Sequence, residues 1–195
     1  MGVVYQAQDL ELDRLVALKF LPAHLDVDET HKKRFALEAK AASRLDHANI
    51  CTIYEIGETE PAPGEPGGQM FIAMAHYDGE SLRDKLKRGP LPVEEALHIA
   101  TQIAEGLAKA HDREIIHRDI KPANIMVTSE GVVKIVDFGL AKIAGIKITK
   151  TDTTLGTLAF MSPEQMRGEG VDQRADIWSW GVLLYEMLSG QQGGI

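Results

Sequence analysis

The spacing of apolar residues divides this chain of 195 residues into two parts. Four segments of the first part are strand-like: residues 3–8, 15–20, 51–56 and 70–75. After the second of them, Asp28 offers helix-start chemistry, and apolar residues then recur at spacings of three and four up to Leu45. The rest of the chain is mostly helices and loops. A strand-rich part with one helix, followed by a helical part, predicts an α+β protein with two lobes and a cleft between them.

The helical signals begin at Ser81, which has capping-box spacing to Asp84 for a short helix. Pro92 opens a longer helix, in which apolar residues recur at helical spacing as far as His111. Residues 177–188 form the most apolar window, but they contain Glu186 and fall short of the roughly 20 residues that a membrane span requires. We therefore expect a buried helix there, and no membrane contact from this segment.

The charge balance argues against nucleic-acid binding, because the formal net charge is -8 whereas a phosphate backbone attracts clustered Lys and Arg. Cys51 is the only cysteine, which excludes an intrachain disulfide and favours a reducing compartment. We expect Cys51 to be a plain core thiol. The chain starts without the basic and apolar run of a signal peptide, so a cytoplasmic location is expected, which leaves open a membrane anchor outside these residues.

Glu38 lies on the apolar stripe of the predicted first helix, in line with Phe35, Ala39 and Ala42. A carboxylate on a core-facing stripe is unfavourable unless a cation meets it. Glu38 is therefore expected to have a positively charged partner.

The strongest chemical signal is the run His117, Arg118, Asp119, Ile120, Lys121, Pro122, Ala123, Asn124, followed by Asp137, Phe138 and Gly139. Taken alone, the second motif is most often just a turn. Together they resemble the catalytic loop and the metal-binding motif of protein kinases. Two further motifs agree in order and spacing: Val16-Ala17-Leu18-Lys19 resembles the strand with the nucleotide lysine, and Ser162-Pro163-Glu164 resembles the end of the activation segment.

The resemblance is to the eukaryotic-like Ser/Thr kinases of bacteria, and it implies roles for the polar residues. Asp119 would accept the proton of a substrate hydroxyl, and Lys121 would neutralise charge on the transferred group. Asn124 and Asp137 would hold Mg²⁺, with Mn²⁺ as an alternative, because both supply hard oxygen ligands. Lys19 would bind the phosphates of ATP, and an ion pair from Glu38 would hold Lys19 in place.

The resemblance also implies a site for the adenine base. Ala17 shares a strand face with Lys19, and its small methyl leaves room for a flat ring. Val4 would cover the adenine ring, Met126 would lie beneath it, and Met74 would be the gatekeeper residue. The Ala75 carbonyl and the Tyr77 amide would form hydrogen bonds with the edge of the base. Gly2 would belong to the Gly-rich loop over the phosphates.

Ser/Thr specificity is implied by Lys121 in the catalytic loop and by Thr157 after Gly156. Arg118 beside Asp119 resembles kinases that are regulated by phosphorylation of the activation segment, where Thr151, Thr153 and Thr154 lie. Asp176 would tether the backbone of the catalytic loop. Glu164 would need an arginine partner that the family supplies from a later region.

The resemblance covers residues 1–195 as one partial kinase domain, with an N-lobe at 1–75 and the hinge and C-lobe at 76–195. Only the tail of the Gly-rich loop is present, and the chain stops after the apolar helix, so we expect truncation at both ends and exposed hydrophobic sides on that helix. The leading hypothesis is transfer of phosphate from Mg-ATP to Ser/Thr hydroxyls of protein substrates. The alternatives are an impaired fragment or pseudokinase that acts as a binding module, and a small-molecule phosphotransferase.

Overall fold

The structure is a computed structural model that describes residues 4–22, 29–61, 68–138 and 158–191. Several predicted site residues lie outside these ranges, namely Gly2, Thr151, Thr153, Thr154 and Thr157. The side chain of Glu38 is also outside the described part, although its backbone belongs to a helix.

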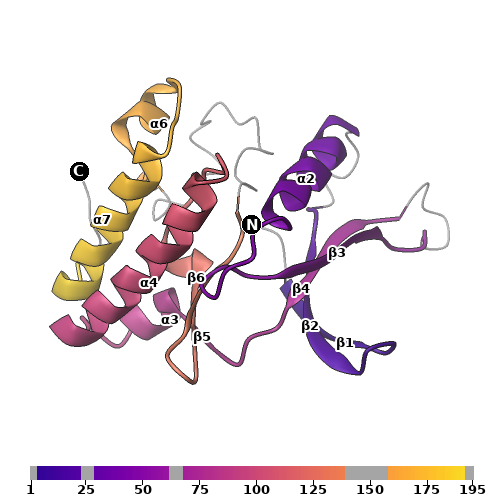
Figure 1. Cartoon of the computed structure of the whole chain (residues 1–195), viewed down its shortest axis with the longest axis horizontal. Coiled ribbons are helices and arrows are strands. Elements are labelled where there is room, and N and C mark those ends of the chain that lie inside the picture. Colours follow the sequence, from indigo (N-terminus) through magenta and orange to yellow (C-terminus); the bar gives the residue numbers. More distant parts are fainter. Residues whose placement is uncertain (1–3, 23–28, 62–67, 139–157, 192–195) are drawn as a thin grey trace.

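A four-stranded antiparallel sheet forms the first part of the molecule (Figure 1). Its strands are β1 (Val4–Asp9), β2 (Arg14–Phe20), β3 (Ile53–Glu58) and β4 (Met70–Ala75), in the order β1-β2-β4-β3. The polar turn between the first two strands is held by Asp9, whose Oδ1 accepts the N–H groups of Glu11 and Leu12. The four predicted strands are confirmed to within two residues at each end.

Helix α2 (Glu29–Ala42) packs on one face of this sheet. Its Phe35 and Ala39 form a buried cluster with Leu21 and with Ile72 of β4. The apolar stripe that predicts the helix therefore meets the sheet, as its spacing requires.

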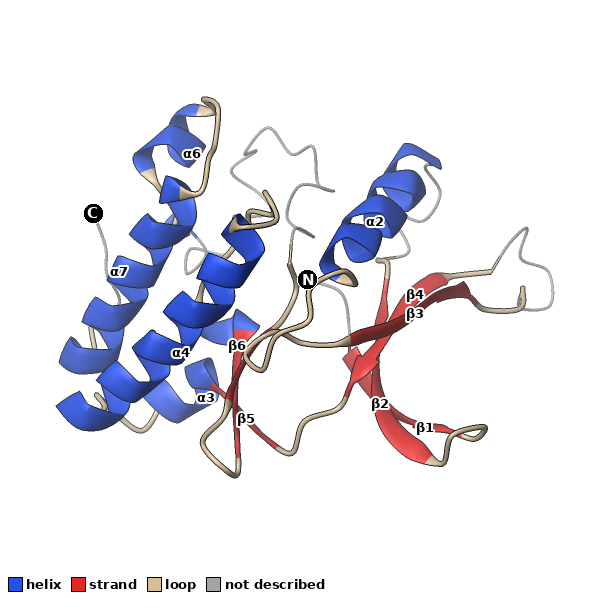
Figure 2. Ribbon diagram, viewed as in Figure 1, coloured by secondary structure: helices blue, strands red, loops and turns tan. Residues whose placement is uncertain are grey.

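A second, smaller sheet lies between the first sheet and the helices (Figure 2). It contains β5 (Gly79–Ser81), β6 (Ile125–Thr128) and β7 (Val133–Ile135), all antiparallel. Gly79 permits the close pairing, because a Cβ there would lie 2.2 Å from the Val127 carbonyl oxygen. A short 3-10 turn, η1 (Pro122–Asn124), leads directly into β6.

The remaining part is helical, with α3 (Leu82–Leu86), α4 (Val93–His111), α6 (Pro163–Arg167) and α7 (Arg174–Ser189). Helices α4 and α7 lie side by side, and the indole N–H of Trp180 donates to the Ala100 carbonyl at 2.9 Å (Figures 1 and 2). Ile99 and Ile103 of α4 and Leu183 and Met187 of α7 belong to the main core. This arrangement confirms the predicted α+β, two-lobed kinase-like fold.

The buried helix expected in the apolar window at residues 177–188, α7, is buried along one side, and the expected exposure of its apolar side chains is confirmed. Ala175, Ser179, Leu183 and Met187 are buried, whereas Ile177, Trp178 and Tyr185 are 55%, 40% and 53% exposed. Within the described ranges, α7 packs against α4 along one side only, so its other apolar side chains face outward. No helix in the described part of the chain is long and apolar enough to cross a membrane.

The loop between α2 and β3 connects the two parts through Asn49, which is buried. Its side-chain amide donates to Gln102 Oε1 of α4 at 2.9 Å and to the Val133 carbonyl at 3.0 Å. Its own carbonyl accepts the Ile135 N–H at 2.9 Å. These contacts attach the loop between α2 and β3 to α4 and to β7.

Candidate active site

A single buried carboxylate organises the loop that carries the strongest sequence motif. Asp176, in the first turn of α7, has no exposed surface. Its Oδ2 accepts the His117 N–H at 2.8 Å and its Oδ1 accepts the Arg118 N–H at 2.7 Å. The His111 ring lies 2.8 Å from Oδ2. A buried carboxylate is tolerated only with such partners, so this cluster ties the loop to α4 and α7.

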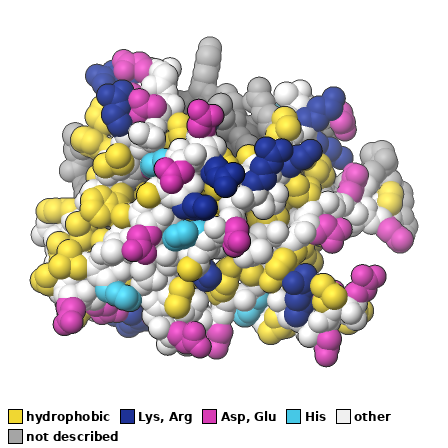
Figure 3. Space-filling view, viewed as in Figure 1, with side chains coloured by type: hydrophobic (Ala, Val, Ile, Leu, Met, Phe, Trp, Pro, Cys, Tyr) yellow, Lys and Arg dark blue, Asp and Glu magenta, His cyan; other side chains and the backbone are white. Residues whose placement is uncertain are grey.

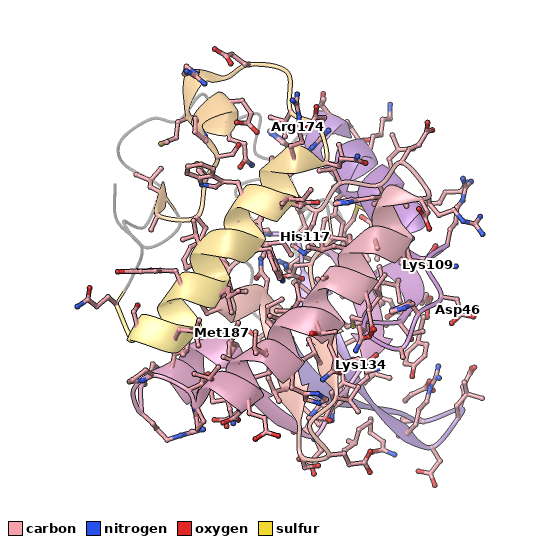
Figure 4. The ribbon with its side chains drawn as sticks, turned by 60° about the vertical axis from the view of Figure 1, so that its left-hand side comes forward. Asp46, Lys109, His117, Lys134, Arg174 and Met187 are labelled. Atoms are coloured by element: carbon pink, nitrogen blue, oxygen red, sulfur yellow. The ribbon has the colours of Figure 1, made fainter. Side chains whose placement is uncertain are left out.

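His117 is buried between the long helices and β7 (Figure 4). Its Nδ1 lies 3.2 Å from the Asp119 N–H, which can only donate, and its Nε2 lies 2.9 Å from the Val136 carbonyl, which can only accept. The ring therefore accepts a hydrogen bond at Nδ1 and donates one from Nε2. The Phe138 ring meets it edge-on at a centroid distance of 4.7 Å. His117 thus links the segment before Asp119 to the segment before Asp137.

The Asp119 carboxylate accepts hydrogen bonds from one ammonium group and one side-chain amide. Lys121 Nζ lies 2.9 and 2.7 Å from its two oxygens, and Asn124 Nδ2 lies 3.0 Å from Oδ2. Asn124 Nδ2 also donates to the Asp119 backbone carbonyl at 2.8 Å. The Asp119 side chain remains 23% exposed, so an incoming hydroxyl can reach an oriented carboxylate.

Asn124 has a second feature that bears on metal binding. Its amide nitrogen is satisfied, but its Oδ1 is buried and has no hydrogen-bond partner. A buried acceptor without a partner is unfavourable unless a ligand completes it. The Asn124 backbone carbonyl accepts the N–H of Val136, the residue before Asp137, at 3.0 Å. The amide oxygen of Asn124 and the carboxylate of Asp137 fit the oxygen ligands that Mg²⁺ prefers.

Across from this loop, Lys19 of β2 forms an ion pair with Asp137, with 2.6 Å between Nζ and Oδ2. The two side chains are 10% and 15% exposed. Asp137 has a φ of 66°, in the left-handed region that few non-glycine residues occupy. The predicted Lys19–Glu38 pair involves a side chain outside the described part of the chain, so it stays a prediction.

The predicted adenine site is spread over two sheets. In the first sheet, Val4 is paired with Lys19 and Met74 with Ala17, so all four side chains share one face. Met126 lies in the second sheet, opposite Ser81. Val4 is 53% exposed, whereas Met74 is buried.

The hinge after Met74 is held by the start of β3. The Ala75 N–H donates to the Thr52 carbonyl at 2.9 Å, and the Thr52 N–H donates to the Tyr77 hydroxyl at 3.2 Å. Burial raises the pKa of Tyr77 above its usual value. Among the described residues the Tyr77 amide has no backbone partner, which leaves it open to a ligand.

A small pocket lies behind Met74, between α2 and the first sheet. Cys51, Asp137 and Phe138 contribute to its wall, but Val4, Ala17 and Met126 do not. Cys51 is 7% exposed, which confirms the expected core thiol, and burial raises its pKa to about 12.

The described end of the predicted activation segment begins at Leu158. Ser179 Oγ donates to the Phe160 carbonyl at 2.7 Å, and Ser162 caps α6. No ion pair joins Glu164 to another described residue, and the Arg118 Nε atom is buried without a partner. The four threonines lie outside the described residues.

Three residues that contact the candidate site were not predicted as site residues from the sequence. They are His111, Lys134 and Gln165. The Ser-x-x-Gln spacing from Ser162 to Gln165 is a capping-box signal and could have pointed to Gln165. Lys134 donates to the Ala48 carbonyl at 2.6 Å and lies 4.8 Å from the Tyr77 ring centre.

Charge is unevenly distributed over the face that Figure 3 shows. Lys and Arg side chains gather in a band above its centre, whereas Asp and Glu side chains are scattered over the face and its rim. Across the described residues, no three His, Cys, Asp or Glu side chains gather as a metal site. A metal at Asn124 and Asp137 would thus rely on other ligands for the rest of its coordination shell.

Comparisons with known proteins agree with this geometry. Residues 1–193 match the protein kinase domain family. The chain is 40% identical over 194 residues to the serine/threonine-protein kinase PknB of Mycobacterium leprae, covering 98% of this chain and 31% of that protein. It is 41% identical over 191 residues to the serine/threonine-protein kinase PknL of Mycobacterium bovis, covering 97% of this chain and 46% of that protein. The chain therefore spans less than half the length of these relatives.

Proposed function

The chain belongs to the protein kinase family, and we propose that it transfers the terminal phosphoryl group of ATP to Ser or Thr hydroxyls of proteins. The observation that carries this proposal is the Asp119 carboxylate, which is oriented by Lys121 and Asn124 and is still open to solvent. Phosphoryl transfer requires little covalent work from the protein, so an oriented base and well-placed cations suffice.

In the proposed reaction, the substrate hydroxyl donates a hydrogen bond to Asp119, which takes up the proton as the oxygen attacks in line. Lys121 holds both Asp119 oxygens, so the carboxylate cannot rotate away from the hydroxyl. The same ammonium group would neutralise charge on the transferred phosphoryl group. Holding the reacting groups in place removes orientation entropy from the barrier.

Asn124 and Asp137 would hold Mg²⁺, and the unpartnered Oδ1 of Asn124 supports this assignment. The bound cation would neutralise the negative charge of the phosphates. Asp137 is now paired with Lys19, and both groups would gain new partners when a nucleotide binds: Lys19 the phosphates and Asp137 the cation. The Lys19–Asp137 pair thus holds the proposed phosphate-binding ammonium group next to the proposed metal-binding carboxylate. Mn²⁺ would fit the same oxygen ligands.

The adenine would lie on the face shared by Val4, Ala17 and Met74, with Met126 below it and the Ala75 carbonyl and Tyr77 amide at its edge. The matching register of β1, β2 and β4 supports this placement. We further propose that Gly2 belongs to the loop that covers the phosphates. Glu38 would form the ion pair that holds Lys19 in place.

Regulation by phosphorylation is a further part of the proposal. The Nε atom of Arg118 is buried and unpaired, so a phosphate on Thr151, Thr153 or Thr154 would satisfy it by a charge-assisted hydrogen bond. Thr157 and Glu164 would contribute to the protein-substrate segment. The division into lobes at 75/76 and the cytoplasmic location also remain proposals.

The test uses the whole chain with Mg²⁺, labelled ATP and a generic Ser/Thr-containing protein, beside an Asp119→Asn variant. Asparagine keeps the shape of the side chain but cannot accept a proton, so we expect transfer to fall at least about 100-fold. Equal transfer by both proteins would refute Asp119 as the base. A wild-type chain that binds ATP but transfers nothing would instead favour the reading as a pseudokinase or an impaired fragment.

A further inference from the structure

One side chain of the activation-segment end reaches the backbone of the catalytic loop. Gln165, in α6, donates from Nε2 to the Arg118 carbonyl at 2.9 Å. Its Oε1 accepts the Ser162 N–H at 3.0 Å, and the Ser162 hydroxyl accepts the Gln165 N–H at 3.4 Å. A single amide therefore closes the capping box of α6 and also bonds to the residue before Asp119.

The chemistry of the two contacts requires glutamine. The Ser162 N–H can pair only with an oxygen, and the Arg118 carbonyl can pair only with a donor, so the two partners fix the orientation of the amide. Capping boxes use Glu or Gln at this position. Glutamate would close the same box, but an ionised carboxylate has no donor for Arg118.

The carbonyl that Gln165 holds belongs to an unusual stretch of backbone. Arg118 has a φ of 67°, a left-handed conformation that is unfavourable for a residue with a Cβ. Its N–H is held by Asp176 of α7 at 2.7 Å, and its carbonyl by Gln165 of α6. Two different helices thus hold the two sides of one strained residue.

The same carbonyl is part of the peptide group that leads into Asp119. The N–H of this peptide donates to His117 Nδ1 at 3.2 Å. Gln165 and His117 therefore fix the peptide plane from opposite edges, and the direction of that plane sets where the Asp119 side chain starts.

We propose that Gln165 is a positioning residue for Asp119, and that it couples the docking of α6 to the orientation of the base. The inference rests on the proposed function, because it concerns the role of Asp119 in phosphoryl transfer. The docked state is the one seen here, with Phe160 buried, Ser162 buried and Phe160 held by Ser179. When α6 leaves this position, the Arg118 carbonyl loses its donor.

The deciding variant is Gln165→Glu, which keeps the capping box and removes only the donor to Arg118. We expect kcat to fall about tenfold, because one hydrogen bond is lost and a carboxylate oxygen then faces the Arg118 carbonyl oxygen. KM for ATP should stay within about twofold of wild type. The matched variant is Ser162→Ala, which weakens the capping box but leaves both bonds of the Gln165 amide in place. It should unfold more easily and lose less kcat than Gln165→Glu.

Amide hydrogen exchange of residues 117–121 tests the same link without relying on activity. Exchange there should be about tenfold faster in Gln165→Glu and close to wild type in Ser162→Ala. If Ser162→Ala perturbs kcat and exchange as much as Gln165→Glu, Gln165 acts only through the cap of α6 and the proposal is overturned. If the wild-type chain transfers no phosphate, the proposed function fails for this chain, while the exchange comparison still decides whether Gln165 positions the loop.

Discussion

The two sides of the candidate site are built differently. On the side of the catalytic loop, the backbone of His117, Arg118 and Asp119 is bonded to α6, α7 and its own histidine ring. On the side of the first sheet, the described polar contact to the loop after β7 is one ion pair, Lys19 with Asp137. The proposed base is thus already oriented, whereas Lys19 and Asp137 would change partners when ATP binds. We infer that this difference lets one lobe move without disturbing the base.

Asp176→Ala should have the largest effect, because it breaks the better-connected side. Three donors near Asp176 would lose their acceptor in a buried place, so we expect a loss of roughly 3–5 kcal/mol in the free energy of unfolding. Urea unfolding monitored by tryptophan fluorescence measures this loss. Glu169→Ala, which removes an exposed carboxylate close by in the chain, is the control and should change stability little. A loss below about 1 kcal/mol for Asp176→Ala would mean that the loop does not depend on this tether.

Lys19→Met tests the other side. We expect ATP affinity to fall at least about tenfold, because the charge that would meet the phosphates is gone, while the chain stays folded. Titration with ATP and Mg²⁺ measures the affinity, and hydrogen exchange of residues 117–121 should not change. Faster exchange in that loop would contradict the comparison, because it would show that the base depends on the Lys19–Asp137 pair.

The pH dependence of stability tests whether the Cys51 thiol is buried in the pocket behind Met74. Burial raises the pKa of its thiol from 9.0 to about 12, so above pH 9 the unfolded chain releases this proton and the folded chain keeps it. The contribution of Cys51 to stability is therefore complete below pH 9 and is lost as the pH rises toward 12. Between pH 8 and pH 10 the wild type should lose about 1 kcal/mol more than Cys51→Ala. Parallel curves for the two proteins would show that the pocket admits water to the thiol.

The smallest effect is expected at the surface pair of Arg174 and Asp172, whose side chains are 81% and 52% exposed. Arg174→Ala should change the free energy of unfolding by less than about 0.5 kcal/mol, because water screens such pairs. Thermal unfolding at low and high salt measures it. A large, salt-insensitive loss would indicate that Arg174 packs against α4 rather than pairing at the surface.

The sequence predicted the parts of the fold whose patterns are long enough to carry a period. Examples are the four strands of the first sheet, the apolar stripe of α2 and the long helix α4 after Pro92. Strands β5 and β6 were not predicted, because their residues, Gly79–Ser81 and Ile125–Thr128, do not alternate between apolar and polar. The apolar pattern of α7 predicts a helix but does not by itself indicate which side is covered, because the helix is almost uniformly apolar.

For the site, sequence motifs brought the right residues into one region but did not supply their contacts. Lys121 and Asn124 follow Asp119 at short spacing, so their closeness could be anticipated. The ion pair of Lys19 with Asp137 and the bond from Gln165 to Arg118 join residues far apart in the chain. Such contacts depend on how the elements pack, and no local pattern encodes them.

The attachment of Asn49 to α4 has a mechanical consequence. Because the loop after α2 is bonded to Gln102 and Val133, we infer that rocking of the small lobe would turn near the C-terminal end of α2, which would act as a fulcrum. The 14 residues of α2 span about 21 Å, so a swing of about 10° would leave Ala42 almost still and carry Glu29 by about 4 Å. Displacement along α2 is thus graded, and Glu38, near the fulcrum, travels only a small part of the distance that the far end covers.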